Sequence, residues 1–400
     1  MKRVLIWIGR LGAVLVAAIA LFAAFNWTMV RNMVAAGGKS NTETEHLVAS
    51  QTVIGCELRP IVKSKAKPIS DQTLGHMQAF SDKHKGLGLL VLYDGKLVYE
   101  RYAKGVAGDT RMQTFSMNKS VTAMMIGIAL ADGKIKSIDT PLGVTLPELN
   151  LDGATIATRP VRGGITLRHL LTMASGLHNP SMANGEWAAM SIMLADNIEK
   201  TALGLPMERV PGTEFKYNNA NPQIAGAVIR RALGKESYAS YLSRTLWCGV
   251  GNATATLWAE SAGGAPRFYA GLNAGLHDWA RLGQLVLDKG SVGGKQIVPA
   301  DWIAAMTTAS ATNSNYGMHI WLGSPADGTR EYSPEAGIAA KHSAPYTAKD
   351  VFFFDGFGGQ RVYIIPSSNL VIARTGETDM SWDDAPLVNL ALAGMQAPPK

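Results

Sequence analysis

Ser116 and Lys119 are spaced to act as a nucleophile and its base. Both lie at the start of the apolar stretch FSMNKSVTAMMIGIALADGKI, residues 115–135, and residues three apart on a helix share one face. A serine hydroxyl attacks well only when a neighbouring group takes its proton. Burial and the positive potential of a helix N-terminus favour a neutral lysine amine, which can act as that base. The tetrapeptide alone favours a simpler interpretation, in which Ser116 caps the helix and Lys119 extends to solvent.

The stretch PGTEFKYNNANPQIAGAVI, residues 211–229, contains two side chains that could complete the site. Tyr217 and Asn219 stand at the beginning of a predicted helix. A phenol close to a lysine can relay a proton to a leaving group, and Asn219 can hydrogen-bond to a substrate carbonyl or to Lys119. The alternatives are a tyrosine at the edge of the core and an asparagine that caps the helix.

A glycine-rich junction near the C-terminus is the third candidate part of the site. In FFFDGFGGQRVYIIP, residues 352–366, Gly356, Gly358 and Gly359 separate two predicted strands. Glycine at this junction permits a close approach of the backbone to a ligand. The backbone amides of Ser116 and Phe357 could then form an oxyanion hole. The alternative is a simple hairpin turn.

Other types of site find little support in the sequence. The chain has no G-x-S-x-G motif, and its eight histidines form no H-E-x-x-H or other metal-ligand cluster, so we expect neither a metal nor a cofactor. His169 is predicted to be a packed or capping residue rather than a base. Trp187 could line an apolar substrate cleft, although packing in the core is the commoner role.

A sheet built from both ends of the chain is predicted to position these residues. The segment GLGLLVLYDGKLVYERY, residues 86–102, is two apolar runs around Asp94-Gly95, and both turn residues tolerate positive φ, which predicts a hairpin. The helix that starts at Ser116 should end at Asp132-Gly133. Four further strands and a final helix are predicted in 316–323, 349–356, 359–366, 369–376 and 385–395.

The predicted fold class is therefore α/β (α+β), an antiparallel sheet built from both chain ends with flanking helices and an inserted, mainly helical subdomain. We assign residues 67–400 to one domain, with a sheet subdomain of 67–140 and 310–400 and a helical subdomain of 141–309. The polar residues 34–66 are predicted to be a linker.

The beginning of the chain predicts export. Lys2, Arg3 and Arg10 precede an apolar run, residues 11–30, which has the roughly 20 residues of a membrane-spanning helix. Because a basic flank stays in the cytoplasm, we expect residues 1–33 to anchor the protein in the inner membrane, facing the periplasm. A cleaved signal peptide, which would leave a secreted or periplasmic protein, is the alternative.

Composition and cysteine content limit the remaining possibilities. The 400 residues are 47% hydrophobic and 17% charged, with a net charge of +7, which fits a globular protein with a sizeable core. Lys and Arg are scattered without a basic run, so no nucleic-acid partner is expected. In an exported chain Cys56 and Cys248 can form a disulfide, and two unrelated buried thiols are the alternative.

Taken together, these stretches resemble a known family of enzymes. Serine hydrolases of the class C β-lactamase and penicillin-binding-protein superfamily contain, in the same order, segments similar to SMNKSVTAMMIGIALADGKI, LRHLLTMASGL, PGTEFKYNNAN, GLNAGLHDWARLGQLVLDKG, GGKQIVPADW and GFGGQRVYIIP. The resemblance covers roughly residues 85–395. It implies a β-lactamase-like fold, with Ser116 as the nucleophile, Lys119 as its base partner and Tyr217 as a proton shuttle. It also implies that the Ser116 and Phe357 amides form the oxyanion hole.

The chain departs from the β-lactamases at a position that bears on the substrate. Those enzymes carry Lys-Thr-Gly on the strand beside the nucleophile, and its lysine helps to hold the antibiotic's carboxylate. The corresponding residues here look like Phe354-Asp355-Gly356. Phenylalanine cannot bind a carboxylate, and Asp355 would repel one. Arg374-Thr375-Gly376 resembles the motif but ends the following strand, so we interpret it as unrelated.

The segment from Gly356 to Gln360 instead resembles the branch of esterases and 6-aminohexanoate-dimer hydrolases. We therefore expect a serine hydrolase that cleaves a small-molecule ester or linear amide through an acyl-enzyme intermediate. The enzymatic alternative is a β-lactamase or D-alanyl-D-alanine peptidase-like enzyme. The alternative from another class is a non-catalytic binding or receptor protein that uses the same cleft.

Overall fold

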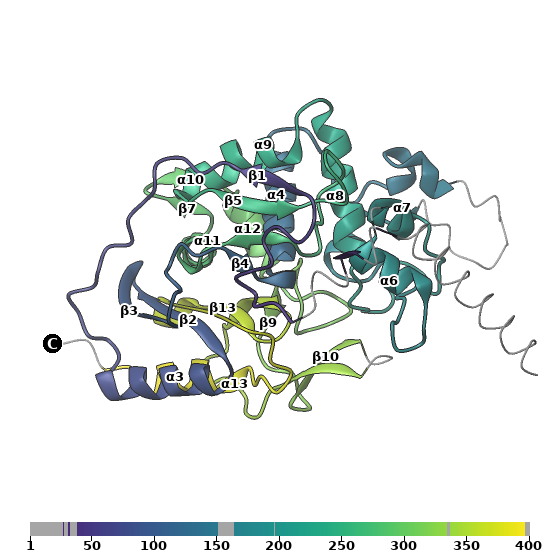
Figure 1. The fold of residues 1–400 in the computed structure, drawn as a ribbon. Helices are drawn as coiled ribbons and strands as arrows, with labels where there is room; N and C mark the ends of the chain where they lie inside the picture. Colours follow the sequence, from purple (N-terminus) through teal and green to yellow (C-terminus); the bar gives the residue numbers. More distant parts are fainter. Residues whose placement is uncertain are drawn as a thin grey trace, which may run out of the picture.

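The structure is a computed structural model that describes Trp27 and residues 31–32, 38–150, 164–195, 197–333 and 337–396. A six-stranded antiparallel sheet forms its centre, in the order β3-β2-β14-β13-β12-β9. Its strands are β2 (Gly86–Tyr93), β3 (Lys96–Tyr102), β9 (Trp321–Leu322), β12 (Phe352–Gly356), β13 (Gln360–Ile365) and β14 (Leu370–Gly376). Figure 1 shows α3 (Asp71–Lys83) and α13 (Ala385–Ala393) along one face of this sheet and α11 (Leu276–Leu287) over the other.

The sheet joins the two ends of the chain, which confirms the predicted fold class. β2 pairs with β14, and Val91 lies opposite Ile372. Because helices cover both faces, β13 and β14 are buried along their whole length. The β2–β3 hairpin turns at Asp94 and Gly95, whose φ angles are +52° and +70°, as the turn signal requires. In the predicted strand 316–323, only Trp321 and Leu322 pair with the sheet.

The helix that carries Lys119 is buried on all sides. This helix, α4 (Asn118–Ala131), has every residue from Asn118 to Ala129 buried, which explains why its apolar residues form no single stripe. It ends as predicted, with Gly133 at φ +69° beyond the last turn. Its start differs from the prediction, because a 3₁₀ turn (Phe115–Met117) precedes it. Ser116 therefore lies in this tighter turn rather than in the α-helix.

A mainly helical region lies next to α4, with α8 (Ala220–Leu233) and α12 (Ala300–Met306) packed directly on it. Its other helices are α5 (Leu167–Leu171), α6 (Trp187–Leu194), α7 (Ile198–Leu203), α9 (Tyr238–Leu242) and α10 (Cys248–Val250). This region also contains a small sheet of order β1-β5-β6-β4. Two hairpins, β7-β8 and β10-β11, belong to neither this sheet nor the central one. These strands are β1 (Ser50–Val53), β4 (Met112–Gln113), β5 (Ala255–Trp258), β6 (Leu272–Ala274), β7 (Ser291–Val292), β8 (Lys295–Gln296), β10 (Thr329–Ser333) and β11 (Ile338–Lys341).

The position of α11 corrects the predicted subdomain boundary. This helix falls within the range 141–309 assigned to the helical subdomain, yet it packs on β2, β13 and β14 of the central sheet. Gly283 permits this contact, because a Cβ atom there would lie 2.6 Å from Val362 and 2.9 Å from Val371. Helical periodicity shows that α11 has an apolar face, but it does not show which surface that face covers.

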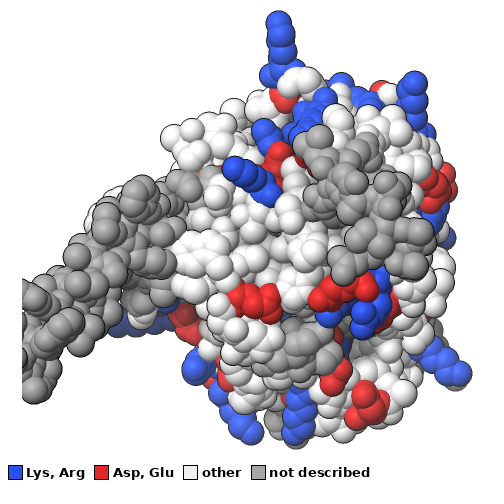
Figure 2. Space-filling view, turned by 90° about the vertical axis from the view of Figure 1, so that its right-hand side faces the viewer, with Lys and Arg blue, Asp and Glu red and all other residues white. Residues whose placement is uncertain are grey.

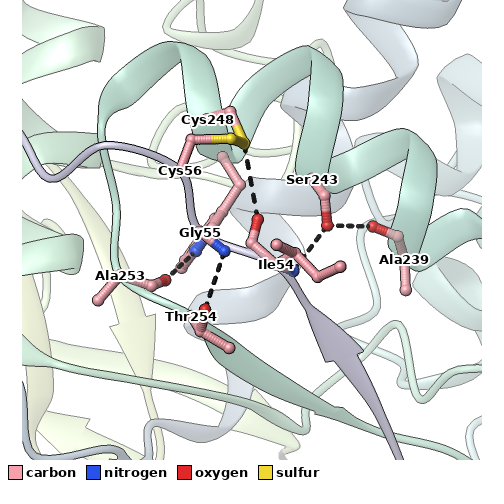
Figure 3. The surroundings of a disulfide bond; sticks show 9 residues. Ile54, Gly55, Cys56, Ala239, Ser243, Cys248, Ala253 and Thr254 are labelled. Carbon is pink, nitrogen blue, oxygen red and sulfur yellow. Dashed lines mark hydrogen bonds between the residues drawn. A yellow bond between two sulfur atoms is a disulfide. The ribbon is translucent and has the colours of Figure 1, made fainter.

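The described part of the predicted linker 34–66 is attached to the domain rather than free. β1 pairs with β5 along four residues, and the Asn41 side chain donates to the Gly376 carbonyl at 2.8 Å. Cys56 and Cys248 form a disulfide. Figure 3 shows the backbone next to Cys56 held by further hydrogen bonds, including one from the Ile54 amide to the Ser243 hydroxyl at 2.8 Å. The polar composition of this segment suggested a free linker. Backbone pairing and a disulfide, rather than apolar side chains, hold it against the domain.

The predicted membrane segment lies almost wholly outside the described residues. Of the run 11–30, only Trp27 is described. Within the described ranges, no helix is long and apolar enough to cross a membrane. Figure 2 views the molecule from the right-hand side of Figure 1, where α6, α7 and β10 lie, and shows basic and acidic side chains interspersed on that face.

Candidate active site

Ser116 and Lys119 lie in direct contact at the start of α4. The Nζ atom of Lys119 is 2.6 Å from the Ser116 hydroxyl oxygen. Lys119 is 1% exposed, whereas Ser116 is partly exposed. Nζ also donates to Asn219 Oδ1 at 2.9 Å and to the Tyr269 carbonyl at 3.2 Å. A neutral amine has two hydrogens and one lone pair, so these two acceptors leave the lone pair available to the Ser116 hydroxyl.

The protonation states of Lys119 and Tyr217 separate their chemical roles. Burial lowers the pKa of the Lys119 amine to about 7, and the negative charge of Asp355 opposes this shift. Burial raises the pKa of the Tyr217 phenol well above its ordinary value, Asp355 adds to the rise, and a hydrogen bond with Ser116 opposes it. At neutral pH the amine can therefore accept a proton, while the phenol keeps its own.

The fold brings Tyr217 and Asn219 to Lys119 through the packing of α8 on α4. Asn219 stands at the N-cap of α8, as predicted, but its side chain binds Lys119 rather than capping the helix. The neighbouring Asn218 accepts from the Ala220 amide at 2.9 Å and donates to the His178 carbonyl at 2.8 Å. Asn218 thus fixes the turn that presents Tyr217 and Asn219.

The two segments that hold the predicted oxyanion amides are in contact. A Cβ atom on Gly356 would lie 2.2 Å from the Thr114 carbonyl oxygen, so only glycine fits where β12 meets the turn that carries Ser116. The rings of Phe115 and Phe357 meet edge to face, with centroids 5.9 Å apart. Phe115 has φ +51°, a strained conformation for a non-glycine residue directly before the candidate nucleophile.

The other two glycines of the junction serve the hairpin turn. Gly358 and Gly359 have φ angles of +73° and +95° between β12 and β13. Cβ atoms there would lie 2.7 Å from Thr378 and 2.9 Å from Trp382, so their close contacts are with the chain itself. Arg374 is buried and donates to the Gly359 carbonyl at 2.9 Å, which places this arginine in support of the turn.

Asp355 does not present the repelling charge expected from the sequence. It is 4% exposed and belongs to a group of four buried residues, here called the buried ion network. The members of this network are Asp355, Asp384, Arg330 and Arg361. Arg330 lies 2.9 Å and Arg361 2.8 Å from Asp355, and the Tyr332 hydroxyl donates to it at 2.7 Å. The prediction of repulsion is wrong because it left out both counterions, Arg361 opposite Asp355 across the β12–β13 hairpin and Arg330 on β10.

Two further candidates take positions that the sequence left open. Trp187 begins α6 and is 45% exposed, so the alternative of core packing is wrong. His169 accepts a hydrogen bond from the Thr166 amide at 3.2 Å as part of a helix cap, as predicted.

Sequence reasoning missed the Tyr269 carbonyl, since a backbone acceptor carries no motif. It also missed Trp321, whose ring stacks on Tyr217 with centroids 5.7 Å apart.

The comparison with known families agrees with this geometry. A model of the Beta-lactamase family matches residues 71–385. The chain belongs to the Beta-lactamase family. With this membership, the chain is a serine hydrolase of β-lactamase-like fold, and the resemblance inferred from the sequence is confirmed.

Two of the proteins that this β-lactamase-family chain resembles are described as 6-aminohexanoate-dimer hydrolases, and a third is described as a carboxylesterase. The 6-aminohexanoate-dimer hydrolase of Paenarthrobacter ureafaciens is 23% identical, over 74% of this chain and 72% of that protein. The solved structure of a candidate 6-aminohexanoate-dimer hydrolase from Bacillus anthracis superposes with a TM-score of 0.68 at 20% identity, covering 88% of this chain and 90% of that one. The structure of a family VIII carboxylesterase superposes with a TM-score of 0.57 at 16% identity, covering 85% of this chain and 100% of that one. These structures share the fold.

Proposed function

We propose that this chain hydrolyses an ester or a linear amide of a small molecule through an acyl-enzyme intermediate on Ser116. The observation that carries the proposal is the 2.6 Å contact between the Ser116 hydroxyl and the Lys119 amine, whose burial gives it a pKa of about 7. A partly exposed hydroxyl next to a buried base can meet a substrate on one side and lose its proton on the other.

In the acylation step, Lys119 takes the proton from the Ser116 hydroxyl as its oxygen forms a bond to the substrate carbonyl carbon. The carbonyl oxygen becomes an oxyanion, which the amides of Ser116 and Phe357 would stabilise. The Tyr217 phenol gives its proton to the leaving oxygen or nitrogen as the bond to carbon breaks, and the protonated Lys119 restores that proton.

Deacylation runs through the same groups. A water molecule loses a proton to the neutral Lys119 amine as its oxygen bonds to the acyl carbon, and the Ser116 oxygen leaves with a proton returned from Lys119. The acid product departs, and the site regains its starting protonation. The Ser116 oxygen connects the two groups that exchange protons, since Nζ of Lys119 contacts it at 2.6 Å and the Tyr217 phenol has a hydrogen bond with Ser116.

Esters and linear amides are favoured over β-lactams by the strand beside the nucleophile. Phe354 is fully buried, and the charge of Asp355 is taken up by the buried ion network, so neither side chain offers a cation to an antibiotic's carboxylate. The names of two of the similar proteins, a 6-aminohexanoate-dimer hydrolase and a carboxylesterase, suggest the same substrate classes.

We also propose that the chain is exported and anchored in the inner membrane by residues 1–33, with the domain in the periplasm. The disulfide between Cys56 and Cys248 supports export, because such bonds persist outside the reducing cytoplasm. The test is to fractionate cells and identify the N-terminal peptide by mass spectrometry. An intact N-terminus in the membrane fraction is expected, whereas a shortened chain in the soluble periplasmic fraction would favour a cleaved signal.

The hydrolysis of p-nitrophenyl butyrate by the full-length protein tests the proposed function. We expect Ser116→Ala to abolish turnover while circular dichroism stays unchanged, and Ser137→Ala, on an exposed turn, to retain it. Equal turnover by the Ser116→Ala and unaltered proteins would refute Ser116 as nucleophile. A cephalosporin tested in parallel should be a poor substrate, and rapid cephalosporin turnover would favour the β-lactamase alternative.

A further inference from the structure

The segment before β1 contains a buried polar residue that contacts two parts of the domain. Asn41 is 5% exposed, although the sequence around it is polar. Its backbone carbonyl binds one part of the domain, and its backbone amide and side-chain Nδ2 bind another. Burying a polar side chain costs free energy unless hydrogen bonds replace those with water. These contacts therefore fix the path of the segment against the domain.

The carbonyl of Asn41 supports the turn that carries Ser116. It accepts a hydrogen bond from the Gln113 backbone amide at 3.0 Å. The side-chain oxygen of Gln113 in turn accepts from the Phe115 amide at 3.0 Å. Phe115 has φ +51° and directly precedes Ser116. A strained backbone conformation persists only where the surrounding structure holds it, so Gln113, with Asn41 behind it, helps to hold the nucleophile in place.

The side chain of Asn41 supports the turn that carries Phe357. Its Nδ2 atom donates to the Gly376 carbonyl at 2.8 Å, at the end of β14. The same carbonyl accepts from Gln360 Nε2 at 2.9 Å, and the Gly376 amide donates to Gln360 Oε1 at 2.8 Å. Gln360 is fully buried and begins β13 directly after the Phe357 turn. The position of Gly376 therefore helps to set the position of the Phe357 amide.

A carboxylate completes the attachment of this segment to the end of β14. Oε2 of Glu377 accepts from the Asn41 amide at 2.9 Å, and Oε1 of Glu377 accepts from the Ser40 hydroxyl. Hydrogen bonds to an ionised group are about twice as strong as those between neutral groups. Glu377 thus reinforces the contact that Asn41 makes with Gly376.

We propose that Asn41 is a positioning residue for the oxyanion hole, an inference that rests on the proposed function. Asn41 joins the turn of Ser116 to the strand end that supports the turn of Phe357, and these two turns carry the two amides of the hole. An oxyanion hole stabilises the transition state only when both N–H groups point at the same oxygen. A small displacement of one turn from the other therefore lowers the rate.

Asn41→Ala tests the proposal in the full-length protein, because it removes the bond to Gly376. The kcat/KM for p-nitrophenyl butyrate should fall about tenfold to a hundredfold. The affinity for propylboronic acid should fall by a similar factor. In that complex the Ser116 oxygen bonds to boron, Lys119 takes the hydroxyl proton, and one oxygen of the tetrahedral anion occupies the oxyanion hole, as in the transition state. The pH dependence of kcat/KM should stay unchanged, since the contacts of Lys119 remain.

Gln51→Ala is the matched control within the same segment. The Nε2 atom of Gln51 donates to the Gly264 carbonyl at 2.9 Å, so this variant loses the same kind of hydrogen bond at a place that involves neither turn. We expect Gln51→Ala to lose stability comparable to that lost by Asn41→Ala in denaturant titration. It should nevertheless retain the kcat/KM and the boronic acid affinity of the unaltered protein.

Glu377→Gln is a second variant, at a partly exposed position where folding is at less risk. It keeps an acceptor oxygen for the Asn41 amide but removes the charge, so kcat/KM and boronic acid affinity should fall together by about twofold to fivefold. If Asn41→Ala does not fold, this variant decides the question by the same criteria.

Three results would overturn the proposal. They are an unchanged kcat/KM in Asn41→Ala, a fall in its kcat/KM without a fall in its boronic acid affinity, and an equal loss of kcat/KM in Gln51→Ala. An active mature chain that begins after Asn41 would overturn it as well. If p-nitrophenyl butyrate turnover still depends on Ser116 in these cases, the proposed function stands, whereas loss of that dependence overturns both.

Discussion

The backbone carbonyl of Tyr269 lies 3.2 Å from Lys119 Nζ, while the hydroxyl of the same tyrosine donates to the Ile192 carbonyl at 2.9 Å. One residue therefore holds both the candidate base and the C-terminal turn of α6. The Tyr269 carbonyl and Asn219 Oδ1 each accept one of the two hydrogens of a neutral amine. The position of the amine lone pair thus depends on two contacts, of which the sequence indicated the one with Asn219 but not the one with the Tyr269 carbonyl.

The first prediction concerns pH. Because the pKa of Lys119 is lowered to about 7, the neutral amine is about a tenth of the population at pH 6 and about nine tenths at pH 8. The kcat/KM for ester hydrolysis should rise through this range to a plateau. Lys119→Ala should lose roughly 10²- to 10⁴-fold in kcat/KM, the usual contribution of a general base, whereas the exposed Lys136→Ala should not. A profile that is flat from pH 6 to 8 would contradict this assignment.

Asn219→Asp tests the environment of Lys119 directly. A carboxylate at the present Oδ1 position, 2.9 Å from Nζ, favours the charged ammonium and raises the pKa of Lys119, by one unit or more for so close a contact. The rise in kcat/KM should then move to higher pH. Asn219→Ala removes the acceptor without adding charge, and it should lower kcat/KM with a smaller shift of the profile. Identical profiles for the two variants would argue against this contact.

Tyr217→Phe should affect substrates according to their leaving groups. The phenol is protonated at neutral pH, and its proposed role is to protonate the departing atom. A p-nitrophenolate can leave without being protonated, whereas an alkoxide or an amine leaves readily only when it is protonated. The variant should lose more kcat/KM with hexyl butyrate and with an amide than with p-nitrophenyl butyrate. Tyr99→Phe, on the other edge of the sheet, should lose nothing with any of them, and equal losses for all substrates in Tyr217→Phe would exclude the role.

The disulfide should contribute substantially to stability. Cys56 and Cys248 are 192 residues apart in sequence, and cross-links that close long loops restrict the unfolded chain most. Replacing both cysteines by serine should lower the free energy of unfolding by about 2–5 kcal/mol, measured by denaturant titration. Limited proteolysis should then cut the segment that carries β1 sooner. A double variant as stable as the unaltered protein would show that the cross-link is dispensable.

The buried ion network predicts a loss of stability in acid. Its two arginines lower the pKa of Asp384 to about 2, against the unfavourable effect of burial. Since the pKa of this carboxyl is lower in the folded than in the unfolded state, its contribution is complete above about pH 4 and is lost as the pH falls towards 2. Asp384→Asn should weaken this acid dependence and cost about 3–5 kcal/mol, because Arg330 and Arg361 lose a counterion. Calorimetry between pH 2 and 6 measures both effects.

Local signals in the sequence predicted the parts of the structure that depend on neighbouring residues. Asp94-Gly95 predicted its hairpin, and Gly133 predicted the end of α4, because left-handed turns need such residues. The contact between Ser116 and Lys119 follows from their spacing of three residues. The sequence did not predict that Arg330 and Arg361 neutralise Asp355, or that β1 pairs with β5. The contact of Arg330 with Asp355 and the pairing of β1 with β5 join distant segments whose meeting is decided by tertiary packing, whereas Arg361 lies opposite Asp355 within one hairpin.

The most direct test of the central claim is to trap the acyl-enzyme. Full-length protein is mixed with p-nitrophenyl butyrate at pH 8 and quenched in acid within a turnover, and the mass of the intact chain and of its peptides is measured. We predict one added butyryl group per chain, located on Ser116 in the peptide that contains Lys119, and none in Ser116→Ala. Hydrolysis without any butyryl adduct, or an adduct on another residue, would contradict Ser116 as the nucleophile.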